Sequence, residues 1–241
     1  MKLKIIFSSL LIILFFARCD FSQTLITPSD DISTKEFSFN DYSGLKVSHA
    51  FKVQVYFSDS KESVVIEAND NLHQYIEVIK EENSLSIGLK NNVLVKGNAT
   101  LKAYITTKAL HSFSGSGASH INVADIIKET DININLSGAS YFTAEVHTKN
   151  ITTDLSGASE INLSGIAKDC SISASGASKF KDYALTTDYL YADLSGASKI
   201  YITIIKEISV EASGASMLYY KGQAFSISQD LSGGSKLIST N

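Results

Sequence analysis

The stretch that decides the fold is Asp131-Ile132-Asn133-Ile134-Asn135-Leu136-Ser137-Gly138-Ala139-Ser140-Tyr141-Phe142, because its four-residue motif Ser-Gly-Ala-Ser recurs along the chain. The last copy reads Ser-Gly-Gly-Ser, and the seven copies begin at Ser116, Ser137, Ser156, Ser175, Ser195, Ser213 and Ser232. Successive copies are 18 to 21 residues apart, with no helical pattern between them. A period of this length is typical of a solenoid, in which each repeat buries its apolar face only by stacking on its neighbours. The sequence therefore predicts an all-β β-solenoid with about seven coils.

Apolar residues alternate with polar ones on both sides of the motif, as in Ile132, Ile134 and Leu136. Side chains two apart on a strand share one face, so this face is predicted to be the interior. Continued through the motif, the alternation places the glycine and the second serine inside and the first serine and alanine outside. The inward serines of adjacent coils would lie about 4.8 Å apart, close enough for a ladder of hydroxyl groups.

The chain divides into a signal segment at 1–19, a linker at 20–35 and a single domain at 36–241. Within the domain, 36–108 is expected to form a strand-rich cap and the first coils, with a short helical turn at 71–75. Residues 109–241 form the repeat region. We expect the cap strands to lead directly into the solenoid.

Residues 1–19 have two lysines and then an apolar run too short to span a bilayer, as export signals do. The run ends in Ala17-Arg18-Cys19, which is similar to a lipoprotein signal whose cysteine is lipidated; Arg18 departs from that pattern. Lipidation of Cys19, ordinary cleavage and a retained anchor all stay open. The segment predicts an exported outer-membrane or cell-surface lipoprotein, or a periplasmic protein. Cys170 would then be a buried, unpaired cysteine.

Five further segments carry a family resemblance: FNDYSGLKV at 39–47, AFKVQV at 50–55, ANDNL at 68–72, SLSI at 84–87 and SFSGSG at 112–117. With the recurring Ser-Gly pairs, they resemble the auto-transporter adhesin head GIN domain family of Bacteroidetes envelope proteins. The resemblance implies a right-handed parallel β-helix with an adhesin-like or unassigned envelope role, and no catalytic residues carry over.

Composition and motifs exclude several function classes. The net charge of −4 is not concentrated in a block, which is unlike the basic surface of a nucleic-acid-binding protein. The five histidines are scattered, and there is no Gly-x-Ser-x-Gly nucleophile motif. The sequence favours a non-catalytic binding or scaffolding protein. The alternative is a β-helical carbohydrate-active enzyme, a polysaccharide lyase or hydrolase, but such enzymes usually build a substrate groove from longer loops than this period allows.

The first candidate site is a ladder three positions before each repeat glycine, predicted to face outward: Ser114, Asn135, Asp154, Ser173, Asp193, Glu211 and Asp230. The acidic members are Asp154, Asp193, Glu211 and Asp230. Exposed carboxylates screened by water and salt would keep this face soluble. Oxygen-rich ladders also suit a weak calcium site or a partner surface, and no other cofactor is expected.

The second candidate site is a set of outward tyrosines: Tyr189, Tyr191, Tyr201 and Tyr219. Their rings are predicted either to stack on a ligand or to pair across strands. The expected partner is an envelope protein or a glycan, with membrane contact through a lipid on Cys19. An open ladder edge at the last coil also favours homo-oligomers.

Overall fold

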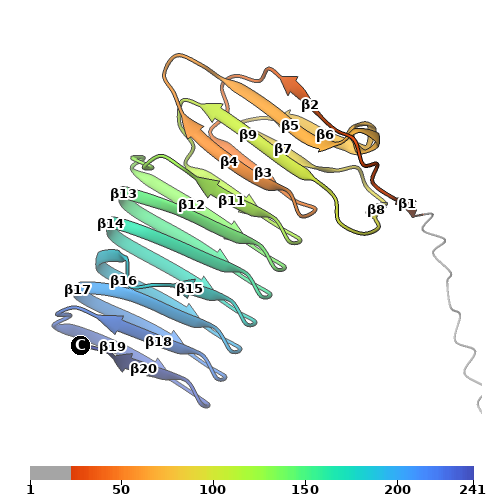
Figure 1. The fold of residues 1–241 in the computed structure, drawn as a ribbon. Coiled ribbons are helices and arrows are strands. Elements are labelled where there is room, and N and C mark those ends of the chain that lie inside the picture. Colours follow the sequence, from red (N-terminus) through yellow and green to blue (C-terminus); the bar gives the residue numbers. More distant parts are fainter. Residues whose placement is uncertain (1–22) are drawn as a thin grey trace, which may run out of the picture.

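The computed structural model describes residues 23–241, and the predicted signal segment with Cys19 lies outside them. The protein is nearly all β and forms a solenoid of about seven turns, which confirms the predicted fold class (Figure 1). The N-terminal strands are β1 (Thr24–Ile26), β2 (Ile32–Phe37), β3 (Gly44–Val47), β4 (Lys52–Phe57), β5 (Ser63–Asn69), β6 (Ile76–Glu81), β7 (Ser84–Leu89), β8 (Val93–Val95) and β9 (Leu101–Thr107). The repeat strands are β10 (Ser112–Gly115), β11 (His120–Val123), β12 (Asp131–Leu136), β13 (Tyr141–Leu155), β14 (Glu160–Ala174), β15 (Lys179–Lys181), β16 (Leu185–Leu194), β17 (Lys199–Ala212), β18 (Met217–Lys221), β19 (Ser226–Leu231) and β20 (Lys236–Ser239).

Each coil has one strand segment before its motif and one after it, and these form two parallel ladders. In the pre-motif ladder, Ile134 is opposite Thr153, which is opposite Ile172 in the next coil. In the post-motif ladder, Phe142 is opposite Ile161, and Ile161 is opposite Phe180. The motif makes one corner of the coil, and long strands such as β13 bend around the second corner (Figure 1).

The core lies between the two ladders and follows the predicted alternation. In β12, Ile132, Ile134 and Leu136 are buried, and the residues between them are exposed. The rings of Phe113 and Phe142 are fully buried, with centroids 5.0 Å apart in adjacent coils. The interior is thus a continuous column of side chains from successive coils.

The repeat glycine does not face inward, so that prediction is wrong. Gly157 is exposed, sits in a turn and has a φ of 71°, a conformation that side-chain-bearing residues rarely adopt. A Cβ atom on Gly157 would lie 2.6 Å from the carbonyl oxygen of Gly138 in the preceding coil. The turn interrupts the strand alternation, which resumes at the second serine. The other positions were predicted correctly in the first six motifs, where the second serines are buried and the alanines are exposed; in the last motif Ser235 is only half-buried.

The predicted hydroxyl ladder is also wrong, because the second serines that form hydrogen bonds within residues 23–241 donate to backbone carbonyls and not to one another. The hydroxyls of Ser140, Ser178 and Ser216 each donate to the carbonyl oxygen of the first serine of the same motif, at 2.8 to 2.9 Å. The hydroxyl of Ser140 also donates to the Gly115 carbonyl oxygen of the preceding coil at 3.2 Å, and that of Ser235 donates to Ser232 at 2.8 Å and to Ala212 of the preceding coil at 3.0 Å. The buried hydroxyls of Ser119, Ser159 and Ser198 have no hydrogen-bond partner within residues 23–241.

Substitution by alanine is expected to change the free energy of unfolding differently at the hydrogen-bonded serines and at the serines without a partner. Ser178→Ala removes a turn-closing hydrogen bond and is expected to lower the free energy of unfolding by about 1 kcal/mol. Ser159→Ala removes a buried hydroxyl without a partner and is expected to leave stability unchanged or raise it by up to about 1 kcal/mol. Urea denaturation of both variants provides the measurement. Equal losses in the two would mean that Ser159 has a partner in solution.

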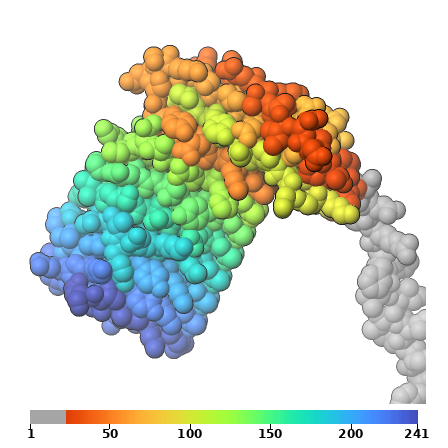
Figure 2. Space-filling model, in the orientation of Figure 1, coloured from red at the N-terminus to blue at the C-terminus, as the bar shows by residue number. Residues whose placement is uncertain are grey.

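The N-terminal strands cap the solenoid and share its hydrogen-bonded sheet. Strand β3 pairs in parallel with β7 and β10, and β4 pairs in parallel with β9 and β11. Beyond them, β6 lies antiparallel to β7, while β5 lies antiparallel to β9 and β2. The cap projects to one side of the stack of coils (Figure 2). Its backbone groups cover the first edge of both ladders.

Two details of the cap bear on the sequence predictions. The 3-10 helix η1 (Asp70–Tyr75) confirms the short helical turn. The segment 20–35 is not simply a linker, because β1 and the start of β2 lie within it and pair with β8 and β5. No helix in residues 23–241 is long and apolar enough to cross a membrane.

Candidate functional site

The strand register brings the predicted outward ladder together. Asn135 is opposite Asp154, and Asp154 is opposite Ser173. Asp193, Glu211 and Asp230 follow on successive coils. All four acids of the ladder are exposed, and none forms an ion pair within the described part of the chain.

The acidic end of this ladder borders a shallow groove of about 210 Å³ beside the motif corner. Its oxygen atoms come from Asp193, Glu211, Asp230, Ser213 and Ser232. Across residues 23–241, no group of three or more His, Cys, Asp or Glu side chains is placed to hold a metal ion. Calcium binding by the ladder stays a prediction, and the observed arrangement is a line of separate exposed carboxylates.

The four predicted tyrosines do not form one surface. Tyr189 and Tyr191 lie on β16 in the pre-motif ladder, whereas Tyr201 and Tyr219 lie on β17 and β18 in the post-motif ladder. The motif corner separates the two pairs, because residues before and after it belong to different faces of the coil. A single ligand-stacking site made of all four is therefore wrong.

Tyr201 and Tyr219 pair with each other across adjacent coils. Their rings are stacked with centroids 4.8 Å apart and planes within 4°, and the edge of Tyr183 meets Tyr201 at 5.7 Å. Burial raises the pKa of Tyr201. Ring faces used in this way are not free to stack on a sugar, which supports the cross-strand interpretation for this pair.

Tyr189 and Tyr191 are more open. The ammonium of Lys206 lies 5.4 Å from the ring centroid of Tyr189 and donates to Asp188 at 2.8 Å. Tyr191 is 47% exposed. Within the described chain its ring has no aromatic or cationic neighbour, so its faces are accessible.

The structure reveals a further site, here called the junction groove, where the cap meets the first coils. It is a shallow depression of about 360 Å³ across β9, β4, β11 and β13. Its exposed and half-buried polar and aromatic side chains are Lys52, Gln54, Lys102, Tyr104, His120, Asn122, Tyr141 and Thr143. They lie in register, with Gln54 between Tyr104 and Asn122.

The amide and aromatic groups of the junction groove are held by contacts with one another. The Asn122 amide nitrogen donates to the Gln54 amide oxygen at 2.8 Å, which leaves the Gln54 nitrogen and the Asn122 oxygen for a ligand. The rings of His120 and Tyr141 lie 5.7 Å apart and are tilted by 40°. The groove thus combines aromatic surface with hydrogen-bonding groups of fixed orientation.

Glu67 on β5 holds the other side of the groove. Its two carboxylate oxygens accept from the Lys102 ammonium at 2.7 Å and from the Tyr104 hydroxyl at 3.1 Å. The hydrogen bond from Lys102 lowers the pKa of Glu67. Glu67 is therefore expected to stay ionised, with both contacts in place, to a lower pH than an ordinary carboxyl group.

Sequence reasoning missed the junction groove because its residues come from strands whose spatial order is not their chain order. Strand β4 lies between β9 and β11, although β9 follows β4 in the chain after about fifty residues. The available signal was the outward alternation of Tyr104 and Tyr141. Without the pairing, nothing in the sequence places those two rings near each other.

The two side chains of the described residues that could be considered as catalytic nucleophiles, Cys170 and Ser48, lack the surroundings that would activate them. Burial raises the pKa of the Cys170 thiol to about 12, so the thiol is protonated and unreactive. Ser48 Oγ lies 2.7 Å from His49 Nδ1, but that nitrogen also accepts from the Leu89 backbone N–H at 3.3 Å. No carboxylate within residues 23–241 forms an ion pair with His49 to orient it as a general base.

Together these features define a capped β-solenoid that presents its polar and aromatic groups on open outer faces. The chain belongs to the family described as "Putative auto-transporter adhesin, head GIN domain", whose model matches residues 41–224, and this confirms the resemblance.

Solved structures agree on the fold. A "putative adhesin" from Bacteroides fragilis superposes with a TM-score of 0.83 at 18% identity, covering 89% of this chain and all of that one. A "putative lipid binding protein" from Parabacteroides distasonis gives a TM-score of 0.75 at 15% identity over 90% of this chain and 100% of its own. A "putative adhesin" from Parabacteroides merdae gives 0.70 at 17% identity over 90% and 99%. Such low identities support the fold alone, and no curated protein matches the chain.

Proposed function

We propose that the protein is a non-catalytic, adhesin-like binding module of the cell envelope that recognises glycans through the junction groove. The observation that supports this most is the convergence of Tyr104, His120 and Tyr141 with the Gln54–Asn122 amide pair in one open depression. Membership of an adhesin family agrees with a binding role.

The chemistry of the groove suits a sugar. The apolar face of a sugar ring packs on aromatic side chains, and its hydroxyls need donors and acceptors of fixed direction. Tyr104 is 37% exposed, and its hydroxyl is held by Glu67, so its ring is presented at little cost in side-chain entropy. The charge of Lys102 is paired with Glu67, whereas Lys52 forms no ion pair with another described residue and adds positive charge, which favours acidic glycans.

The proposal includes export and anchoring. The sequence of residues 1–19 suits an export signal, and a lipid on Cys19 would attach the protein to the outer membrane or cell surface, with a periplasmic location as the alternative. Mass spectrometry of the native N-terminus tests the lipid directly. Self-association through β19 and β20 also remains a prediction.

The second candidate surface is the line of Tyr189, Tyr191 and the acidic ladder, which faces away from the junction groove across the coil. Its carboxylates and one accessible ring suit a basic envelope protein better than an acidic glycan. The enzyme alternative would require new reducing ends when the protein is incubated with acidic and neutral polysaccharides.

The double variant Tyr104→Ala, Tyr141→Ala is expected to weaken binding on a glycan array by at least about tenfold, because two aromatic contacts are lost. Both side chains point outward, so the Tm should change by only a few degrees. Tyr189→Ala, Tyr191→Ala makes the same chemical change on the opposite ladder and serves as the matched control. Glycan binding that survives the first variant, or is lost only in the second, would rule out the junction groove.

A further inference from the structure

A cavity lies at the second corner of the coil, where the regular stack of corners is interrupted. It has a volume of about 470 Å³ and is here called the corner cavity. One wall is residues 108–110, which follow β9, and the other is residues 125–129, which follow β11. A gap opens there because β4 ends at Phe57 and turns back into the cap through β5 instead of continuing to the next coil.

The wall at 125–129 presents the edge of an extended segment. Ile127 N–H donates to Glu145 O, and His147 N–H donates to Ile127 O, both at 2.9 Å. Successive residues of an extended chain direct their backbone groups to opposite sides, so those of Ile126 and Lys128 point away from β13 and toward the cavity. Within residues 23–241, these backbone groups have no hydrogen-bond partner, and neither do those of Ala109 and Leu110 on the other wall.

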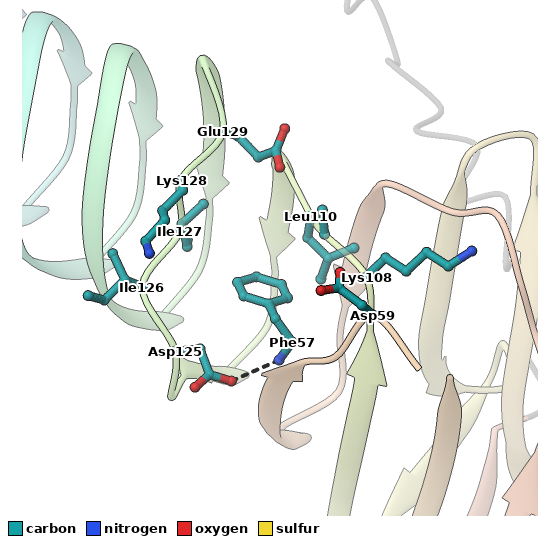
Figure 3. A pocket seen from close by; sticks show the side chains of 10 residues that line it. Phe57, Asp59, Lys108, Leu110, Asp125, Ile126, Ile127, Lys128 and Glu129 are labelled. Carbon is teal, nitrogen blue, oxygen red and sulfur yellow. Dashed lines mark hydrogen bonds between the residues drawn. The ribbon is translucent and has the colours of Figure 1, made fainter. Parts of the chain in front are cut away.

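The floor of the corner cavity is apolar. Leu110 and Ile127 are fully buried core residues, and the ring of Phe57 lies between the two walls (Figure 3). Asp125 closes one end by accepting the Phe57 backbone N–H at 2.8 Å (Figure 3). Because Leu110 and Ile127 have no exposed surface, the half-buried ring of Phe57 is the part of this floor that a ligand side chain can contact.

The rim carries charged side chains of both signs. Lys108 and Asp59 lie on the cap side, and Lys128 and Glu129 lie on the repeat side. None of the four forms an ion pair with another described residue. With Asp125, the cavity is lined by three carboxylates and two lysines, so charges of both signs are available to a ligand with mixed charges on either side of an apolar group.

We propose that the corner cavity binds an extended peptide segment of a partner protein, which enters between the two walls as an added strand. The peptide backbone pairs with Ile126 and Lys128, one apolar side chain packs on the half-buried ring of Phe57, and flanking charged residues pair with the rim. An acyl chain fits less well, because it would bury the backbone groups of Ile126 and Lys128 without partners. This site is independent of the junction groove and of glycan binding.

A phage library of random seven-residue peptides, selected on the purified protein, provides the probe. Synthetic peptides from the selection are expected to bind with a Kd below about 100 μM and to share an apolar residue flanked by charged ones. Ala109→Trp places a ring in the cavity and should weaken their binding at least tenfold. Ala197→Trp makes the same change at an exposed motif corner and should leave binding unchanged.

N-methylation of the peptide backbone tests the added strand itself. In an added strand, every second peptide residue directs its N–H group toward the protein, and a methyl group on one of these nitrogens should weaken binding about tenfold. A methyl group on the nitrogens between them, which point away from the protein, should have little effect. Equal effects at both, a selection without cavity-dependent binders, or binding unaffected by Ala109→Trp would overturn the proposal. If the protein bound a fluorescent fatty acid, lost this binding in Ala109→Trp and bound no peptide, the cavity would be a lipid site instead.

Discussion

Gly157→Ala is expected to lower the free energy of unfolding by at least about 3 kcal/mol, because it combines two separate costs. The first is backbone strain, since Gly157 has a φ of 71°. The second is a collision: the new Cβ would lie 2.6 Å from the oxygen and 3.0 Å from the nitrogen of Gly138. Because both atoms belong to the backbone of the adjacent coil, neither can move without breaking the Ala158 N–H to Gly138 O hydrogen bond of 2.7 Å.

Gly97→Ala separates the two costs. Gly97 also has a left-handed φ, 88°, but no atom lies within 4 Å of its added Cβ. This variant should lose only about 1 kcal/mol, the cost of strain alone. Urea denaturation of both proteins gives the comparison. Similar losses would show that the dihedral angle, and not the close approach of the coils, requires glycine at the motif.

Phe142→Ala is expected to cost about 3 to 5 kcal/mol, the range for removing a fully buried aromatic ring. The cavity would open beside Phe113, whose ring lies 5.0 Å away in the preceding coil. Because each coil contacts only its neighbours, hydrogen exchange should accelerate first in β10, β12, β13 and β14.

Tyr141→Ala changes the preceding residue and is the control for Phe142→Ala. Tyr141 points outward and is only half-buried, so the loss should stay below about 1 kcal/mol. If both variants were equally stable, the alternation of inward and outward residues in β13 would be incorrect.

The repeat was predictable from sequence because its physical basis is local and periodic. The spacing of the Ser-Gly-Ala-Ser copies requires coils of nearly equal length, and strand alternation assigns Ile134 and Phe142 to the interior. The ladder from Ser114 to Asp230 follows from counting back three residues from each repeat glycine, and the strand register places these residues opposite one another in successive coils. Alternation failed at Gly138 because it holds only for extended backbone, and that glycine sits in a turn with φ 69°.

The candidate sites were less predictable because they depend on which strands become neighbours. Tyr191 and Tyr201 are ten residues apart and share outward alternation, yet a corner at Gly196 puts them on different faces. The cap shows the same effect more strongly, since β4 pairs with β9 and β11 and not with the strand that follows it. Long-range pairing of this kind leaves no period in the sequence.

The sequence by itself determined that this chain stacks coils, which strand residues of each coil lie inside, and the family to which it belongs, because each follows from a spacing or a pattern of residues. Only the tertiary structure decided that Tyr104 and Tyr141 share a groove and that Ile126 and Lys128 face an open corner. Those arrangements arise where the cap breaks the repeat, and there the contacts depend on chain topology rather than on local backbone geometry.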